Sequence, residues 1–146
     1  MYRDCSAFKI RRLSRQVTQY YDQALRAYGM KATQVHLLTV IREHAPLTVG
    51  KLAELIGAER TSVSRALQAA QTAGWVEVGP GDDGRSKSVA VTPRGVARLK
   101  EIEPLRSEQE AAFRRGLEGI VSDAFIDDLV RAADRLQEMI EEGEAR

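Results

Sequence analysis

The spacing of apolar residues along the chain predicts a largely helical protein. Near the start, apolar side chains recur three and four positions apart, as on one face of an amphipathic helix over residues 4–28: Ile10, Leu13, Val17, Tyr20, Ala24 and Tyr28. The opposite face carries charged residues: Arg11, Arg15, Asp22 and Arg26. Gly29 is expected to end this helix, because glycine readily adopts the left-handed conformation that closes helices.

Three shorter helices follow, expected over residues 34–44, 49–56 and 60–73. Thr33 and Thr48 are suitable N-caps for the first two, and Pro46 separates them. Gly57 provides a tight turn between the second and the third. Two helices joined by a short turn that contains glycine are typical of a helix-turn-helix.

After Gly74 the apolar residues recur at every second position. Residues 75–78 and 87–91 alternate as strands, and residues 79–86 between them are rich in turn-forming residues. A helix-turn-helix that is followed by such a hairpin is the winged-helix arrangement.

The C-terminal part predicts two further helices. Thr92 and Pro93 open the first, which Pro104 is expected to kink. Ser122 is a suitable cap for the last, which is expected to run to about Glu142. Its apolar positions form a seam suited to packing on another helix: Ile126, Leu129, Ala133, Leu136 and Ile140.

Composition and charge narrow the classes of function. No stretch of the 146 residues approaches the ~18 apolar residues of a membrane span, and the start lacks the apolar run of a secretion signal, so we expect a cytoplasmic protein. With one cysteine and two histidines, and without a nucleophile–base pair or a phosphate-binding glycine loop, we expect neither an enzyme nor a metal site.

The charge is unevenly distributed along the chain. Residues 1–99 carry 15 Lys/Arg against 8 Asp/Glu, whereas residues 100–146 carry 7 against 13. This asymmetry is typical of a chain whose basic end meets a polyanion, and ordinary solvated helix faces are the alternative.

The helix expected over residues 60–73 has the side chains that read base edges. Val63, Leu67 and Ala70 make its inward face, and the segment contains no acidic residue. The outward face and its flanks offer hydroxyls, one amide and one guanidinium: Thr61, Ser62, Ser64, Arg65, Gln68 and Thr72. Arginine pairs with guanine, glutamine with adenine, and hydroxyls with bases or phosphates. An ordinary polar solvent face is the alternative.

The expected hairpin tip carries Asp82, Asp83, Arg85 and Lys87. Arginine suits a narrow minor groove, where the negative potential is enhanced, and Asp83 is close enough in sequence to hold the Arg85 guanidinium. The alternative is a generic turn, because Asp-Gly is common in turns.

Several short segments, in the right order, resemble motifs of the multiple-antibiotic-resistance-regulator (MarR) family. They occupy residues 32–34, 37–38, 52–57, 60–65, 73–76, 82–86 and 91–95, and the resemblance extends from about residue 8 to about residue 120. It implies a mainly α fold with a small β wing, in which a winged helix-turn-helix is joined to N- and C-terminal dimerisation helices. The implied segments are 1–30 for dimerisation, 31–100 for DNA binding and 101–146 for dimerisation.

The resemblance also implies a function and its residues. Members are obligate homodimers whose first and last helices intertwine, usually repressors that read a pseudo-palindromic operator in double-stranded DNA. By position, Thr61, Ser62, Ser64 and Arg65 would enter the major groove, and Arg85, oriented by Asp83, the minor groove. Gln68 and Lys87 complete the candidate DNA-binding set. Many members release DNA when a small, often phenolic, anion binds between the dimer helices and the DNA-binding lobe, and the candidates for that site are Tyr20, Tyr21, Tyr28 and His36.

Two departures from the family pattern leave alternatives open. Ala58 and Glu59 stand where the family often has an Asp cap, so a weakly capped recognition helix is expected, and a winged-helix interaction module without DNA binding is one alternative. A redox-sensing regulator that uses Cys5 is the other. Cys5 lies about two residues too far upstream of Ser14 to match the hydroperoxide-sensing branch, a rotation of roughly 200° on a helix.

Overall fold

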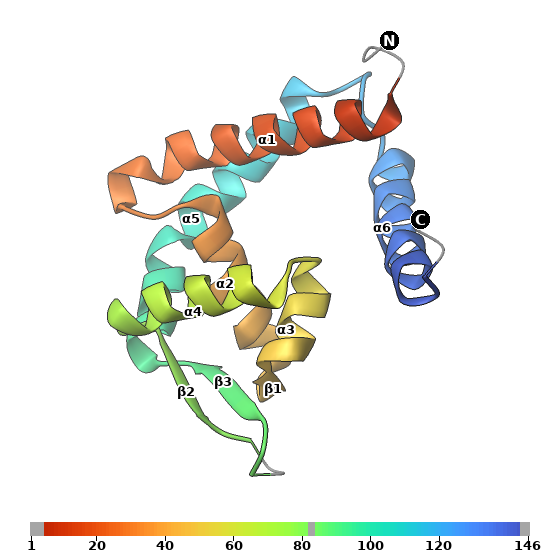
Figure 1. The fold of residues 1–146 in the computed structure, drawn as a ribbon. Coiled ribbons are helices and arrows are strands. Elements are labelled where there is room, and N and C mark those ends of the chain that lie inside the picture. The colour runs from red at the N-terminus through yellow and green to blue at the C-terminus, as the bar shows by residue number, and fades with distance from the viewer. Residues whose placement is uncertain (1–4, 82–83, 144–146) are drawn as a thin grey trace. The chain divides into compact units, whose positions relative to one another are not determined.

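The computed structural model describes residues 5–81 and 84–143, which form helices and a small sheet (Figure 1). The elements are α1 (Ser6–Leu25), η2 (Arg26–Tyr28), α2 (Ala32–His44), β1 (Leu47–Thr48), α3 (Val49–Ile56), α4 (Arg60–Thr72), β2 (Val76–Pro80), β3 (Lys87–Val91), α5 (Pro93–Gly116) and α6 (Asp123–Glu141). The chain divides into two compact units, the first up to Arg106 and the second from Ser107 onward. The expected fold class, mainly α with a small β wing, is confirmed.

A contact from α1 sets where α2 begins. Gly29 closes the first helical segment with φ 62°, as expected. The Asp22 carboxylate then accepts a hydrogen bond of 2.7 Å from the Ala32 amide, and α2 starts at that residue. The expectation that Thr33 caps this helix is therefore wrong, because Thr33 lies inside the first turn and an acceptor from α1 satisfies the free amide.

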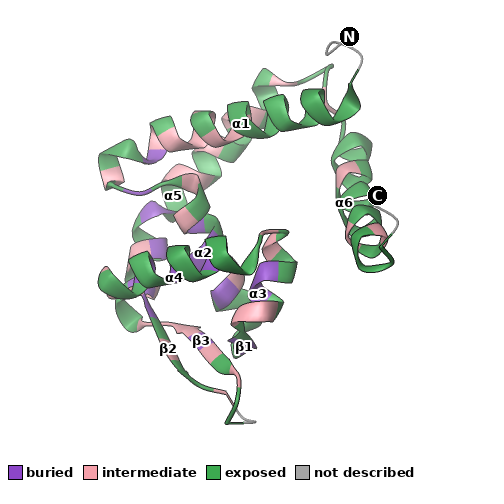
Figure 2. Ribbon diagram, in the orientation of Figure 1, coloured by how far each residue is buried: buried purple, intermediate pink, exposed green. Residues whose placement is uncertain are grey.

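The core of the first unit lies where α2, α3, α4 and α5 meet the sheet, and Figure 2 shows the buried residues gathered there. Leu38 and Ile41 of α2 and Leu52 of α3 are fully buried. The inward face predicted for α4 is confirmed, since its three apolar residues are each at most 4% exposed: Val63, Leu67 and Ala70. Burial of these residues fixes which face of α4 turns outward.

The sheet is antiparallel with the strand order β1-β3-β2, so β3 is central. Leu47 pairs with Val89, and Val76 with Val91. Val76 and Val89 are buried, whereas their neighbours in sequence are more exposed, as the period of two predicts. Trp75, just before β2, packs against the core as a half-buried residue.

A close junction joins the end of α4, the wing and the start of α5. The Thr92 hydroxyl donates to the Gly74 carbonyl at 2.7 Å and accepts from the Gly95 amide at 3.1 Å, and so caps α5 as expected. The Thr92 amide donates to the Trp75 carbonyl at 2.9 Å. A Cβ atom on Gly95 would lie 2.2 Å from that same carbonyl oxygen, so only glycine fits here.

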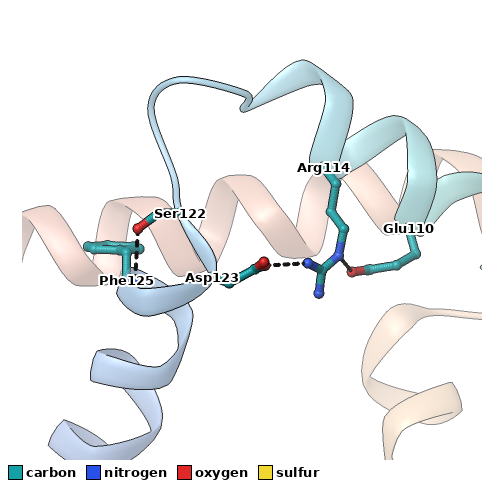
Figure 3. Close-up of polar contacts among 5 residues, drawn as sticks. All are labelled: Glu110, Arg114, Ser122, Asp123 and Phe125. Carbon is teal, nitrogen blue, oxygen red and sulfur yellow. Dashed lines mark hydrogen bonds and ion pairs between the residues drawn. The ribbon is translucent and has the colours of Figure 1, made fainter.

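The second unit contains the end of α5 and all of α6. Helix α5 continues without a break across Pro104 to Gly116. The Ser122 hydroxyl accepts from the Phe125 amide at 3.2 Å and caps α6, as expected. The Arg114 guanidinium lies between Glu110 and Asp123, at 2.8 and 2.7 Å (Figure 3). The hydrogen bond to Glu110 raises the pKa of Arg114 most, and the hydrogen bond to Asp123 raises it further. No helix in the described ranges is long and apolar enough for a bilayer crossing.

We expect Gly95→Ala to lower the free energy of unfolding by about 3 kcal/mol, because the new methyl group would force the wing away from α5. Gly116→Ala is the matched control. It lies at the end of the same helix with nothing within 4 Å, and we expect it to be neutral or to stabilise by up to about 1 kcal/mol. Denaturant unfolding at one fixed protein concentration measures both. Equal stabilities for the two variants would contradict the junction.

We expect Glu59→Asp to raise the free energy of unfolding by about 0.5–1 kcal/mol. Glu59 is the N-cap residue of α4, with extended backbone but no hydrogen bond from its side chain to the helix, and the shorter aspartate reaches the free amides of the first turn. Glu118→Asp, at an exposed position between helices, should give no such gain. The same unfolding measurement decides, and a loss of stability in Glu59→Asp would show that the glutamate has another role.

Candidate nucleic-acid interface

The outward face of α4 is exposed along its whole length. Thr61, Arg65 and Gln68 are exposed opposite the buried apolar residues, with Ser62 and Ser64 exposed on the flanks. No acidic residue lies within α4. The face thus presents donors and acceptors of several kinds, together with one positive charge, to any ligand that approaches it. These are the residue types that pair with base edges in the major groove.

The turn between α3 and α4 is closed by hydrogen bonds that fix where α4 begins. Thr48 caps α3 by accepting from the Lys51 amide at 3.1 Å, as predicted. Gly57 ends α3 with φ 68°, and the next amide, of Ala58, donates back to the Ala53 carbonyl at 3.0 Å. This left-handed closure turns the chain within three residues from one helix into the next. The helix-turn-helix predicted from sequence is therefore present.

Arg60, the first residue of α4, was not singled out from the sequence. Its guanidinium lies over Gly50 in the first turn of α3, where a Cβ atom would come within 3.1 Å of Nη2. The side chain is exposed and adds a positive charge where the two helices of the motif meet. The only sequence signal was a glycine ten positions before an arginine, and spacing of that kind does not reveal a contact between two helices.

The wing is the hairpin of β2 and β3, which extends away from the helices of the first unit (Figure 1). Its tip is closed by a hydrogen bond of 2.8 Å from the Gly81 amide to the Ser86 carbonyl. Arg85 and Lys87 are exposed near the tip. Asp83 lies outside the described residues, so its expected role beside Arg85 stays a prediction.

The candidate effector residues are placed in different surroundings. Tyr20 and Tyr21 are half-buried and meet edge to face, with ring centroids 5.3 Å apart. Tyr28 is half-buried against the core, and its carbonyl accepts a hydrogen bond from Arg98 of α5. His36 is exposed on α2. Their role in effector binding stays a prediction.

Cys5 is an exposed thiol at the N-cap position of α1. Its proposed redox chemistry likewise stays a prediction. In the part of the chain that the structure describes, no group of three or more His, Cys, Asp or Glu side chains is arranged to hold a metal ion.

Comparison with known proteins assigns this geometry to a family. A family model described as the MarR family matches residues 28–86, which span the helix-turn-helix and reach the wing. The uncharacterised HTH-type transcriptional regulator YwoH of Bacillus subtilis is 26% identical over 110 residues, 73% of this chain and 80% of YwoH.

Solved structures of other regulators share this fold over more than nine-tenths of the chain. The M. tuberculosis transcriptional regulator MosR, crystallised in complex with DNA, is 31% identical, with a TM-score of 0.82 over 92% of this chain and 98% of MosR. CouR of Rhodococcus jostii RHA1, crystallised with p-coumaroyl-CoA, has the same fold at 19% identity, with a TM-score of 0.72 over 94% of each chain. The winged helix, the matched family model and the relationship to MosR lead to one conclusion: the chain belongs to the MarR family of transcriptional regulators.

Proposed function

We propose that this protein is a homodimeric repressor that binds a pseudo-palindromic operator and releases it when a small anion binds. The observation that carries the proposal is the exposed, acid-free polar face of α4, held outward by the burial of Val63, Leu67 and Ala70. Its 31% identity to MosR, which was crystallised with DNA, supports the same kind of ligand here.

In the proposed complex, α4 lies in the major groove. Arg65 and Gln68 read base edges there, and the hydroxyls of Thr61, Ser62 and Ser64 bond to bases or phosphates near the start of the helix. Arg85 and Lys87 bring positive charge to the adjacent minor groove or its phosphates. Arg60 adds a cation that is directed to the phosphate backbone. Base contacts therefore come from α4, and contacts that do not depend on sequence come mainly from the wing.

The apolar residues that α1 and α6 leave exposed support the proposed homodimer. The seam predicted for α6 is uncovered in the described chain, with Leu136 56% and Ile140 61% exposed. A second copy buries such a seam and presents two recognition helices at once. The two half-sites are then expected about one helical turn, ~10 bp, apart.

The effector that we propose is a small phenolic or anionic molecule bound near Tyr20, Tyr21, Tyr28 and His36. Half-buried tyrosines offer an aromatic surface together with a hydroxyl donor. CouR, which shares the fold, was crystallised with p-coumaroyl-CoA, a ligand that combines a phenol with anionic groups. We propose no metal and no other cofactor.

We expect Arg65→Ala to weaken operator binding by ~1–3 kcal/mol and to relax discrimination at one base position, because a bidentate contact to a guanine is lost. Arg85→Ala should weaken binding with little change in base preference. Titration of the variants against a duplex from upstream of the protein's own gene, and against duplexes with single base changes, separates the two effects.

Arg115→Ala, an exposed arginine at the end of α5, serves as the charge-matched control and should bind as the wild type does. An unchanged base preference in Arg65→Ala would contradict the placement of α4. A salt series distinguishes an operator-binding protein from a winged-helix module that binds only other proteins, because the affinity for the operator must fall steeply as the salt concentration rises. A wild-type protein with no salt-dependent binding to any duplex would favour the protein-interaction module.

We expect phenolic carboxylates to lower operator affinity at concentrations that do not unfold the protein. A panel such as salicylate, 4-hydroxybenzoate and p-coumarate, added to the preformed complex, tests this directly by fluorescence anisotropy. Tyr20→Leu/Tyr21→Leu should reduce the response while operator binding without effector is retained. Release that persists unchanged in this variant would place the effector elsewhere.

A further inference from the structure

Gly50 lies in the first turn of α3, where the backbone conformation does not require a glycine. Its φ is not positive, unlike that of Gly57 at the end of the same helix. Glycine also weakens a helix relative to other residues, because it loses more conformational freedom on folding. What glycine offers at this position is therefore room for the close approach of another group.

That room is occupied by the guanidinium of Arg60. A Cβ atom on Gly50 would lie 3.1 Å from Nη2, 3.4 Å from Cζ and 3.6 Å from Nε of Arg60, and these are the three nearest atoms outside its own turn. An end-on guanidinium would put Cζ a full bond length farther away than Nη2, so the group lies flat across the glycine. Because the N–H donors of a guanidinium lie in its plane, this packing leaves them directed away from α3.

The Arg60 side chain is exposed at the first position of α4. In the described parts of the chain, no carboxylate pairs with it and no acceptor takes a hydrogen bond from its guanidinium. Lys51, which follows Gly50, differs in this respect, because its ammonium group bonds to Glu54 at 2.6 Å. Arg60 is thus a cation that packs against α3 while its donors remain available to a ligand.

We propose that Gly50 is a positioning residue for DNA binding. Because it has no side chain, it lets the Arg60 guanidinium lie against α3, where the donors meet a phosphate of the DNA backbone. The inference rests on the proposed binding of DNA by α4. It adds a residue that raises the affinity through Arg60 and does not itself touch the DNA.

A backbone phosphate is the favoured ligand because of where Arg60 lies. In helix-turn-helix complexes, the second helix enters the major groove and the first crosses the backbone beside it. Arg60 begins the second helix and its guanidinium lies against the first, so it is placed for the phosphates and not for the bases proposed for Arg65. A guanidinium that is already oriented loses less side-chain freedom when it binds a phosphate. The contact should therefore add affinity for every sequence and preference for none.

Two substitutions and their combination test the proposal. Arg60→Ala removes the cation, and Gly50→Leu fills the place of the guanidinium. Each should weaken binding about tenfold at about 100 mM salt, both to the duplex from upstream of the protein's own gene and to a scrambled duplex. The double variant should bind as Arg60→Ala does, because both changes remove the same contact.

Stability separates the positioning role from damage to the fold. Leucine favours a helix more than glycine does, so Gly50→Leu should be at least as stable as the wild type in denaturant unfolding while it binds DNA more weakly. Gly50→Ala is the milder change, because its methyl group displaces the guanidinium only slightly. It should weaken binding by about twofold, and only when Arg60 is present.

The salt dependence of binding counts the lost contact. Each neutralised phosphate adds about 0.9 to the slope of log affinity against log salt, so the two copies of Arg60 in a homodimer should contribute about 1.8. Fluorescence anisotropy from about 50 to about 300 mM salt should show a slope lower by this amount in Arg60→Ala, in Gly50→Leu and in the double variant. Gly116→Leu, at a helical glycine with nothing within 4 Å, is the matched control and should keep the wild-type affinity and slope.

The outcomes separate this inference from the proposed function. A wild-type protein that binds no duplex in a salt-dependent way overturns both. Wild-type binding together with an unchanged slope in Arg60→Ala or in Gly50→Leu overturns the inference and leaves the proposed function intact. If Gly50→Leu weakens binding further in the Arg60→Ala background, or alters base preference, residue 50 acts on the DNA or on α4 directly, and the inference is likewise overturned.

Discussion

The close approach of α5 to the Trp75 carbonyl is the constraint on which the rest of the first unit depends. Gly95 leaves no room for a side chain there, and the Thr92 hydroxyl ties the end of α4 to the first turn of α5. Because β2 begins just after this point and β3 ends just before it, the junction holds both strands of the wing. Helix α4 and the wing are therefore held beside α5 by one small cluster of contacts.

The two faces of α4 differ in their surroundings: the apolar face is buried in the core, and the polar face is exposed. The buried residues of α4 are Val63, Leu67 and Ala70, and the polar face opposite them is exposed. Residues on that face can vary without loss of core packing, because they are not buried in the core. A regulator family can in this way change its DNA target while it keeps its fold.

Sequence predicted those parts of the fold that local spacing determines. The helix-turn-helix, the cap at Thr48 and the inward face of α4 each follow from neighbours in the chain, and the structure agrees at all three. The start of α2 was missed because its capping group, the Asp22 carboxylate, comes from another helix. The position of Arg60 over Gly50 was missed for the same reason. Contacts between elements depend on packing, which periodicity does not encode.

The bond between Arg98 and the Tyr28 carbonyl has a mechanical consequence. Arg98 lies one helical turn after Gly95. A single turn of α5 therefore contacts both the start of the wing, through Gly95, and the end of the first helical segment, through Arg98. The short segment η2 and the hairpin are thus connected through a stiff rod rather than through a loop. A shift of α1 that carries η2 away from α5 therefore breaks this bond, and it does so within one turn of the residues that hold the hairpin.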